Sequence, residues 1–226
     1  MKMDVRKIAW PCELSAATKQ ALIRHARPLL LDMQQHIRIG SKGSNGLYYV
    51  TDGLAALGLE RQAKTPPLVL IESGQWFGAL LSFGHPELAY RITAVDYVRL
   101  LHIPDEVVRA MAAVNTELFK FLYFIDVRHI RETIDMLFAT AGMDKSKRVA
   151  YLLLKIGERF SARDNAALPV IPLSQAALCK ILGLSRPSLS QELKALQVVG
   201  LIRVERKRVS ILEPAGLQQV ATGTPV

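Results

Sequence analysis

The chain has 226 residues, of which 50% are hydrophobic and 22% are charged, a balance that excludes a disordered tail and a fibre. No run of about 18 apolar residues occurs, so an ordinary transmembrane helix is excluded as well. The net charge of +9 is unevenly distributed: residues 141–226 carry 13 Lys and Arg against 6 Asp and Glu, whereas residues 1–140 carry 16 against 14. A compact basic segment indicates a polyanionic partner, nucleic acid ahead of an acidic membrane.

Cysteine and histidine usage predicts no cofactor and no bound metal. Cys12 and Cys179 are too few for a disulfide framework or for a four-thiolate zinc or iron–sulfur site. The histidines show no paired ligand spacing; they are His25, His36, His85, His102 and His129. Residues 1–7 lead into no apolar signal segment, so we expect a cytoplasmic protein.

The zone from about Leu31 to Ile103 is predicted to be all-β, after a helix over about Ala16–Arg27. Short apolar or β-branched runs alternate there with turn signals, which is typical of a sandwich or barrel. The runs are residues 47–50, 54–57, 68–71, 90–95 and 97–103, and the turn signals are residues 43–46, Asp52-Gly53, residues 65–67 and Ser73-Gly74.

A long helix is predicted over Thr116–Thr140, which contains no Gly or Pro, after a shorter helix that starts at Pro104-Asp105-Glu106. The long helix has two apolar stripes. One stripe contains Leu118, Leu122, Ile125 and Met136, interrupted by His129 and Glu132, and the other contains Phe119, Tyr123, Ile130, Ile134 and Leu137. A helix that is apolar on two sides needs two partners. The β-domain can cover one stripe and a second copy of the helix the other, so we favour a homodimer over burial within one subunit.

Residues 173–202 carry a helix-turn-helix pattern. Ser174 can cap a first helix, Gly183 supplies a tight turn, and Ser185 can cap a second helix with Pro187 in its first turn. The second helix has three leucines at core spacing, Leu189, Leu193 and Leu196. Its other face suits the major groove of DNA and carries Arg186, Ser188, Ser190, Gln191 and Lys194.

A basic wing follows this motif. Two β-like runs, residues 202–205 and 209–212, flank Arg206, Lys207 and Arg208, which suit phosphate contacts. Before the motif, Asp144 can cap a helix that runs to about Phe160. We expect an α+β chain in which residues 1–142 form the β-domain with its long helix and residues 143–226 form the DNA-binding domain.

The order of these elements resembles the Crp–Fnr family of bacterial transcription regulators, also called the catabolite-activator family. Residues 40–57 look like the opening of that family's cyclic-nucleotide-binding β-roll, and residues 74–80 look like the stretch that enters its phosphate-binding cassette. The long helix and the winged helix-turn-helix follow in the family's order. The resemblance implies a homodimer that binds double-stranded DNA and recruits or blocks RNA polymerase.

The β-roll departs from cyclic-AMP-binding members of that family. Their ribose-binding glutamate is replaced here by Ala79, and their phosphate-binding Arg-Ser pair by Leu88 and Ala89. Without these groups a cyclic phosphate and its ribose lose their charge-assisted and acceptor partners. Three interpretations stay open: a more apolar ligand, no ligand, or an anion held by backbone amides near Gly78. The candidate effector-binding residues are Gly78, Ala79, Leu80, Arg91 and Thr133.

The DNA-reading residues depart from the family pattern as well. Arg186 keeps the first recognition arginine, Pro187 replaces a glutamate, and Gln191 replaces an arginine, which favours adenine over guanine at one contact. Ser188 and Ser190 are expected to contact phosphates, and Lys194 and the wing cations to act through charge. Ser174 and Gln175, at the start of the first helix, complete the predicted DNA-binding set.

Two other functional classes compete with a DNA-binding regulator. An enzyme would need a catalytic motif, and neither a nucleophile elbow, a phosphate-binding loop nor a zinc-protease motif occurs. A ligand-binding regulatory module would explain the β-roll but not the winged helix-turn-helix. A cyclic-AMP-type regulator is the remaining alternative.

Overall fold

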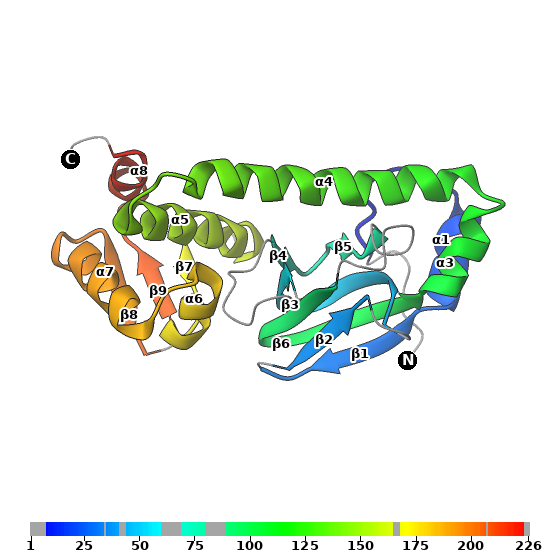
Figure 1. Cartoon of the computed structure of the whole chain (residues 1–226), viewed down its shortest axis with the longest axis horizontal. Coiled ribbons are helices and arrows are strands. Elements are labelled where there is room, and N and C mark those ends of the chain that lie inside the picture. Colours follow the sequence, from blue (N-terminus) through cyan, green and yellow to red (C-terminus); the bar gives the residue numbers. More distant parts are fainter. Residues whose placement is uncertain are drawn as a thin grey trace. The chain divides into compact units, whose positions relative to one another are not determined.

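The computed structural model describes residues 8–33, 35–40, 44–59, 69–79, 89–164, 168–206 and 208–223 (Figure 1). The chain divides into two compact units, Met1–Ile134 and Asp135–Val226, so the division falls within the long helix. The assignment of residues 1–142 and 143–226 to two functional domains stays a prediction.

Within the described residues, the first unit is built on a six-stranded antiparallel sheet. The two long strands, β3 (Gly46–Leu59) and β6 (Tyr90–Pro104), pair with each other along most of their length. The strands β1 and β2 pair with β6, and β4 and β5 pair with β3. The strands are β1 (Arg27–Leu31), β2 (His36–Ile39), β3 (Gly46–Leu59), β4 (Val69–Glu72), β5 (Trp76–Phe77) and β6 (Tyr90–Pro104). The predicted β-rich zone is therefore confirmed.

The pair Asp52-Gly53, predicted as a turn, lies inside β3, and that prediction is wrong. The register between β3 and β6 shifts on both sides of this pair, so the strand continues through a bulge. Gly53 has a φ of +92°, and a Cβ there would lie 2.0 Å from the carbonyl oxygen of Tyr97. A bulge with positive φ and a close backbone neighbour selects the same residues as a hairpin turn. Ser73-Gly74 does form a turn between β4 and β5, whereas residues 43 and 65–67 lie outside the described residues.

Two shorter helices flank the sheet. α1 (Ala16–Arg24) begins after Ser15, whose hydroxyl accepts a hydrogen bond from the Thr18 N–H at 3.3 Å. It ends before the predicted Arg27, because Arg27 starts β1 and pairs with His102 of β6. α3 (Asp105–Ala112) begins where predicted, with two carboxylates in the first turn, near the positive end of the helix dipole.

α4 (Thr116–Thr140) has the predicted bounds, and its two apolar stripes differ in burial. Leu118, Leu122 and Ile125 are at most 5% exposed and belong to a core cluster that also contains Phe121 and Trp76. The second stripe is 44–64% exposed; it consists of Phe119, Tyr123, Ile130, Ile134 and Leu137. The first unit thus covers this stripe from Leu118 to Ile125, as predicted, whereas the side chain of Met136 lies outside the described residues.

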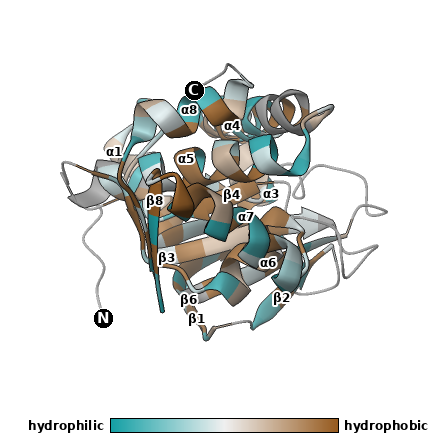
Figure 2. Ribbon diagram, turned by 90° about the vertical axis from the view of Figure 1, so that its left-hand side faces the viewer, coloured by the Kyte–Doolittle hydropathy of each residue, from teal (hydrophilic) through white to brown (hydrophobic). Residues whose placement is uncertain are grey.

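The second unit combines helices with a small antiparallel sheet in the order β7-β9-β8. Its elements are α5 (Lys145–Asp164), β7 (Val170–Ile171), α6 (Gln175–Leu182), α7 (Arg186–Val198), β8 (Ile202–Glu205), β9 (Arg208–Ile211) and α8 (Pro214–Thr222). Asp144 caps α5 by accepting a hydrogen bond from the Lys147 N–H at 2.9 Å, and the helix runs past the predicted Phe160. Figure 2 shows hydrophobic positions along β3 of the first unit and hydrophilic positions toward the end of β8.

Among the residues that the structure describes, no helix is long and apolar enough to cross a lipid bilayer. In the same residues, no group of three or more His, Cys, Asp or Glu side chains is arranged to hold a metal ion.

Candidate nucleic-acid interface and effector cavity

The helix-turn-helix is held by local caps that the sequence predicts. The Ser174 hydroxyl accepts a hydrogen bond from the Ala177 N–H at 3.2 Å, at the start of α6. Gly183 follows α6 with a φ of +63°, the left-handed conformation that a tight turn requires. The Ser185 hydroxyl accepts a hydrogen bond from the Ser188 N–H at 3.3 Å and starts α7. These three predictions are confirmed.

Burial fixes which face of α7 points outward. Leu189, Leu193 and Leu196 are at most 3% exposed, so this face packs into the core of the second unit. The side chains on the opposite face are exposed, with Ser188 half-buried; they are Arg186, Ser190, Gln191 and Lys194. α7 therefore presents to solvent the guanidinium of Arg186, the amide of Gln191 and the ammonium group of Lys194. Ser174 and Gln175, at the start of α6, are half-buried.

The predicted wing is a hairpin of β8 and β9, in which Glu205 pairs with Arg208 in the register. Arg208 belongs to β9 rather than to the connecting turn, where it was expected. Its guanidinium Nε donates to a carboxylate oxygen of Glu205. This hydrogen bond is the main reason that the pKa of Glu205 lies below its usual value, and both side chains are exposed. Arg206 is exposed at the turn, and Lys207 lies outside the described residues.

Gln197, which sequence reasoning missed, links α7 to the wing. Its Oε1 accepts a hydrogen bond from the Val204 N–H of β8 at 2.8 Å. The contact spans seven residues and passes Gly200, which ends the turn after α7 with a φ of +76°. A glutamine on an exposed helix face gives no sequence signal for such a contact.

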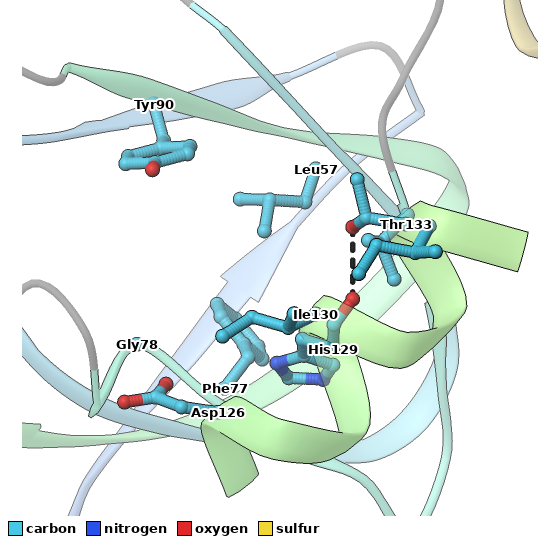
Figure 3. Close-up of a pocket in the computed structure, with 10 residues that line it drawn as sticks. Leu57, Phe77, Gly78, Tyr90, Asp126, His129, Ile130 and Thr133 are labelled. Atoms are coloured by element: carbon cyan, nitrogen blue, oxygen red, sulfur yellow. Dashed lines mark hydrogen bonds between the residues drawn. The ribbon is translucent and has the colours of Figure 1, made fainter. Parts of the chain in front are cut away.

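A cavity of about 240 Å³ lies in the first unit between the sheet and α4 (Figure 3). The sheet contributes hydrocarbon and aromatic side chains, and α4 contributes two isoleucines and the polar groups. The lining residues are Leu57, Val69, Phe77, Gly78, Tyr90, Asp126, His129, Ile130, Thr133 and Ile134. Burial, with a smaller contribution from the charge of Asp126, raises the pKa of Tyr90 above its usual value.

The cavity includes two of the five predicted effector residues, Gly78 and Thr133. The Thr133 hydroxyl donates to the carbonyl oxygen of His129 at 2.8 Å, one turn back along α4 (Figure 3). Its proton is thus used within the helix.

The other predicted effector residues gain no support from the lining. Ala79 is 1% exposed and belongs to the core cluster that also contains Trp76. Arg91 follows Tyr90 in β6 and is absent from the described lining; alternation along a strand places successive side chains on opposite faces. Leu80, together with Leu88 of the altered Arg-Ser pair, lies outside the described residues.

Residues 147–220 match the family model of the Crp-like helix-turn-helix domain. Over almost its full length the chain is similar to a CRP-like cAMP-activated global transcriptional regulator of Mycobacterium tuberculosis, with 26% identity over 215 residues, or 93% of each chain. The chain thus carries a Crp-like helix-turn-helix domain and is similar to a CRP-like regulator along almost its full length.

Solved structures confirm the Crp–Fnr fold and with it the predicted α+β class. A putative crp/fnr transcriptional regulator from Eubacterium rectale has a TM-score of 0.72 at 16% identity, covering 92% of this chain and 95% of its own. A CRP/FNR family regulator from Thermus thermophilus has a TM-score of 0.69 at 22% identity, covering 88% of this chain and all of its own. A Crp–Fnr protein with this helix-turn-helix is a DNA-binding transcription regulator.

Proposed function

We propose that this Crp–Fnr regulator acts as a homodimer that reads a two-part operator through α7. The observation that carries the proposal is the division of α7 into a leucine face at most 3% exposed and an outward face with Arg186 and Gln191. A helix with this division, followed by a wing, is suited to enter the major groove. We propose no catalytic step for this protein. Because its proposed ligand is genomic DNA, we place the protein in the cytoplasm.

The second apolar stripe of α4 supports a dimer. Tyr123 is 63% exposed and Ile130 is 50% exposed, and such side chains gain free energy when a second surface covers them. Isologous pairing of two α4 helices buries this stripe on both copies at once. A dimer also doubles the DNA contacts, which matches an operator built of two half-sites.

Two side chains carry base discrimination in this proposal. The Arg186 guanidinium can donate to O6 and N7 of guanine, and the Gln191 amide can pair with adenine through one donor and one acceptor. Pro187 has no donor and contributes no base contact. The operator therefore contains an adenine where relatives with arginine at the Gln191 position read guanine.

The remaining predicted residues act on the DNA backbone. Hydroxyl and amide groups at the starts of the two helices donate to phosphate oxygens, and the cations contribute charge. These residues are Ser174, Gln175, Ser188, Ser190, Lys194, Arg206, Lys207 and Arg208. RNA polymerase is the protein partner of the assembled complex.

For the β-roll we propose an effector other than cyclic AMP. Ala79 stands in place of the family's ribose-binding carboxylate, and the cavity lining contains Asp126 and neither Lys nor Arg among its described residues. The second candidate is cyclic AMP itself, since the Mycobacterium tuberculosis relative is named as cAMP-activated. Calorimetric titration with cyclic AMP decides: the absence of micromolar binding supports the proposal, and micromolar binding overturns it.

An electrophoretic shift experiment tests DNA binding. Promoter fragments selected from the genome by the purified chain are shifted at about 100 and about 300 mM salt, and affinity should fall steeply with salt because phosphate contacts release counterions. The Arg186→Ala variant should no longer select these promoter fragments, whereas Arg24→Ala, a matched change on α1, should still select them. If the unchanged chain gives no salt-sensitive shift, the DNA-binding proposal is wrong and the protein is a ligand-binding module without DNA affinity.

A further inference from the structure

The first unit has a second pocket, where the start of β1 lies beside the end of β6 and the start of α3 (Figure 1). Its volume of about 340 Å³ falls within the range of roughly 300–1,000 Å³ that is usual for small-molecule sites. It shares no described lining residue with the cavity between the sheet and α4. The lining residues are Arg27, Asn45, His102, Pro104, Asp105 and Glu106.

His102 and the backbone hold one side of this pocket in place. The Asn45 carbonyl oxygen accepts a hydrogen bond from the Asp105 N–H at 3.1 Å and another from the Nε2–H of His102 at 3.1 Å. His102 is 8% exposed, and burial lowers the pKa of its imidazole below the usual 6.5. The imidazole is therefore neutral near pH 7 and adds no charge to the lining.

Two exposed side chains of opposite charge, Arg27 and Glu106, contribute to the same lining. Within the described part of the chain, neither side chain forms a hydrogen bond or an ion pair. Arg27 pairs with His102 in the sheet register, and Glu106 lies in the first turn of α3. The pocket thus has a guanidinium from the sheet and a carboxylate from the helix, and both lack a partner of opposite charge.

Asp105 adds an acceptor that lacks a donor. Its Oδ2 accepts a hydrogen bond from Nε of Arg109 at 2.7 Å, which balances the charge of this carboxylate within α3. Its Oδ1 is buried and has no hydrogen-bond partner among the residues that the structure describes. A buried acceptor without a donor is unfavourable, so an N–H group of a ligand in this pocket gains free energy by donating to it.

The balance of charge determines the class of ligand. Because Arg109 balances Asp105 and the imidazole is neutral, one positive and one negative side chain of the lining remain without partners. A ligand with a single charge satisfies one of them and is repelled by the other, whereas a ligand that carries both charges satisfies both. Pro104 is the one apolar residue of the described lining, which favours a ligand with a short hydrocarbon part.

We infer that this pocket binds a small zwitterion, whose carboxylate is held by Arg27 and whose ammonium group donates to Glu106 and to Oδ1 of Asp105. A guanidinium suits the first contact because its planar fork matches the two oxygens of a carboxylate. The inference goes beyond the proposed function, since it concerns a pocket separate from the proposed effector site and from the DNA-binding helix.

The test uses 4-aminobutanoate, whose flexible chain lets the distance between its two charges adapt to the pocket. 4-Aminobutanamide keeps the ammonium group without the carboxylate, and butanoate keeps the carboxylate without the ammonium group. In calorimetric titrations of the full chain at pH 7 and low salt, 4-aminobutanoate should bind saturably and once per chain. It should bind at least roughly tenfold more tightly than either analogue, because each analogue loses one charge-assisted contact. Equal binding of the three compounds, or no binding of 4-aminobutanoate, overturns the inference.

Variants assign the two charges of the ligand to the two side chains. Arg27→Gln should weaken binding of 4-aminobutanoate at least roughly tenfold without weakening that of 4-aminobutanamide, which has no carboxylate to lose. Glu106→Gln should weaken 4-aminobutanoate in the same way without weakening butanoate. Arg24→Gln and Glu13→Gln change exposed charges outside the lining and are the matched controls, so they should leave all three titrations unchanged.

Thermal melts separate a lost contact from a lost fold. Saturating 4-aminobutanoate should raise the unfolding temperature of the unchanged chain, because the ligand binds the folded state. The variants should unfold at the native temperature without ligand, since both side chains are exposed. If Arg27→Gln keeps that temperature and still binds 4-aminobutanoate as the unchanged chain does, the inference is wrong. An equal loss of binding in Arg24→Gln overturns it as well.

Discussion

The side-chain Oε1 of Gln197 accepts a hydrogen bond from the Val204 N–H at 2.8 Å and so joins the recognition helix to the first strand of the wing. The residues that follow it, Val198 and Val199, are 78% and 66% exposed, whereas Leu201 and Ile202 are 6% and 1% exposed and the Leu201 N–H donates to the Leu196 carbonyl oxygen at 3.0 Å. Packing and backbone hydrogen bonds therefore hold the junction as well, and Gln197 adds the side-chain contact that joins α7 to β8. Gln197 is a positioning residue, since the proposed DNA contacts lie on either side of it.

We expect Gln197→Ala to weaken operator binding severalfold while changing stability little, because a solvent-exposed hydrogen bond contributes about 0.5–1.5 kcal/mol. The measurements are an electrophoretic titration and a thermal melt. Gln219→Ala on α8 removes the same amide from another exposed helix and serves as the control. Equal operator affinities in the two variants would show that the junction does not position the wing.

The ion pair between Glu205 and Arg208 restrains one of the wing's cations. We expect Glu205→Gln to tighten DNA binding, because Arg208 is then released to a phosphate. The slope of log affinity against log salt should steepen by about 1. Glu158→Gln on α5 changes the net charge by the same amount and pairs with Lys155 in the unchanged chain. A gain of similar size in both variants would attribute the effect to net charge alone.

Gln191→Ala should relax the preference at one base pair in each half-site, at a cost of ~1–3 kcal/mol for the preferred sequence. The reason is loss of the paired donor and acceptor with which an amide recognises adenine. Selection from a randomised operator pool measures the result. Lys194→Ala, on the same exposed face, should instead weaken binding to all sequences. An unchanged selected motif in Gln191→Ala refutes its proposed role.

Features that depend on neighbours along the chain could be predicted from the sequence. The bounds of α4 follow from the absence of helix breakers between Thr116 and Thr140, and the helix-turn-helix follows from its caps and leucine spacing. Asp52-Gly53 was misread because a hairpin turn and a β-bulge place the same demand on the backbone.

Features that join distant segments were out of reach. The cavity brings together Leu57 of β3, Tyr90 of β6 and His129 of α4, and His129 read in the sequence only as an interruption of an apolar stripe. Likewise, Trp10 lies 5.2 Å from Trp76 between ring centroids, a contact that no local pattern encodes. The sheet register places Leu57, Tyr90 and Trp76 for these contacts, and it depends on the whole unit.

His102 gives the first unit a pH-dependent stability. Its ring stacks on Tyr48 at 4.5 Å, and its Nε2–H donates to the Asn45 carbonyl oxygen at 3.1 Å. Burial lowers the pKa of this imidazole below its usual 6.5. The unfolded chain therefore binds the proton more readily than the folded one, and stability should fall as pH drops below 6.5.

Thermal melts between about pH 7.5 and about pH 5 measure this loss. His102→Phe keeps an aromatic ring against Tyr48 and should remove this component of the pH dependence. His36→Gln, an exposed position on β2, should keep it. The same pH dependence in His102→Phe would exclude His102 as its source.

Glu117 ties the start of α4 to α1, and its loss should loosen that junction. Its Oε2 accepts hydrogen bonds from the Ser15 N–H at 3.1 Å, the Ser15 hydroxyl at 2.9 Å and the Thr18 hydroxyl at 2.8 Å. These hydrogen bonds lower the pKa of Glu117 below its usual 4.5, and the bond from the Ser15 N–H has the largest effect. The folded chain therefore favours the carboxylate. This stabilisation is complete above pH 4.5 and is lost as pH falls through the lowered pKa.

Glu117→Gln should lower the unfolding temperature at pH 7 by about 2–4 °C, whereas the exposed Glu13→Gln should not. Equal melting of both variants at pH 7 would mean that the charge of Glu117 does not stabilise the junction.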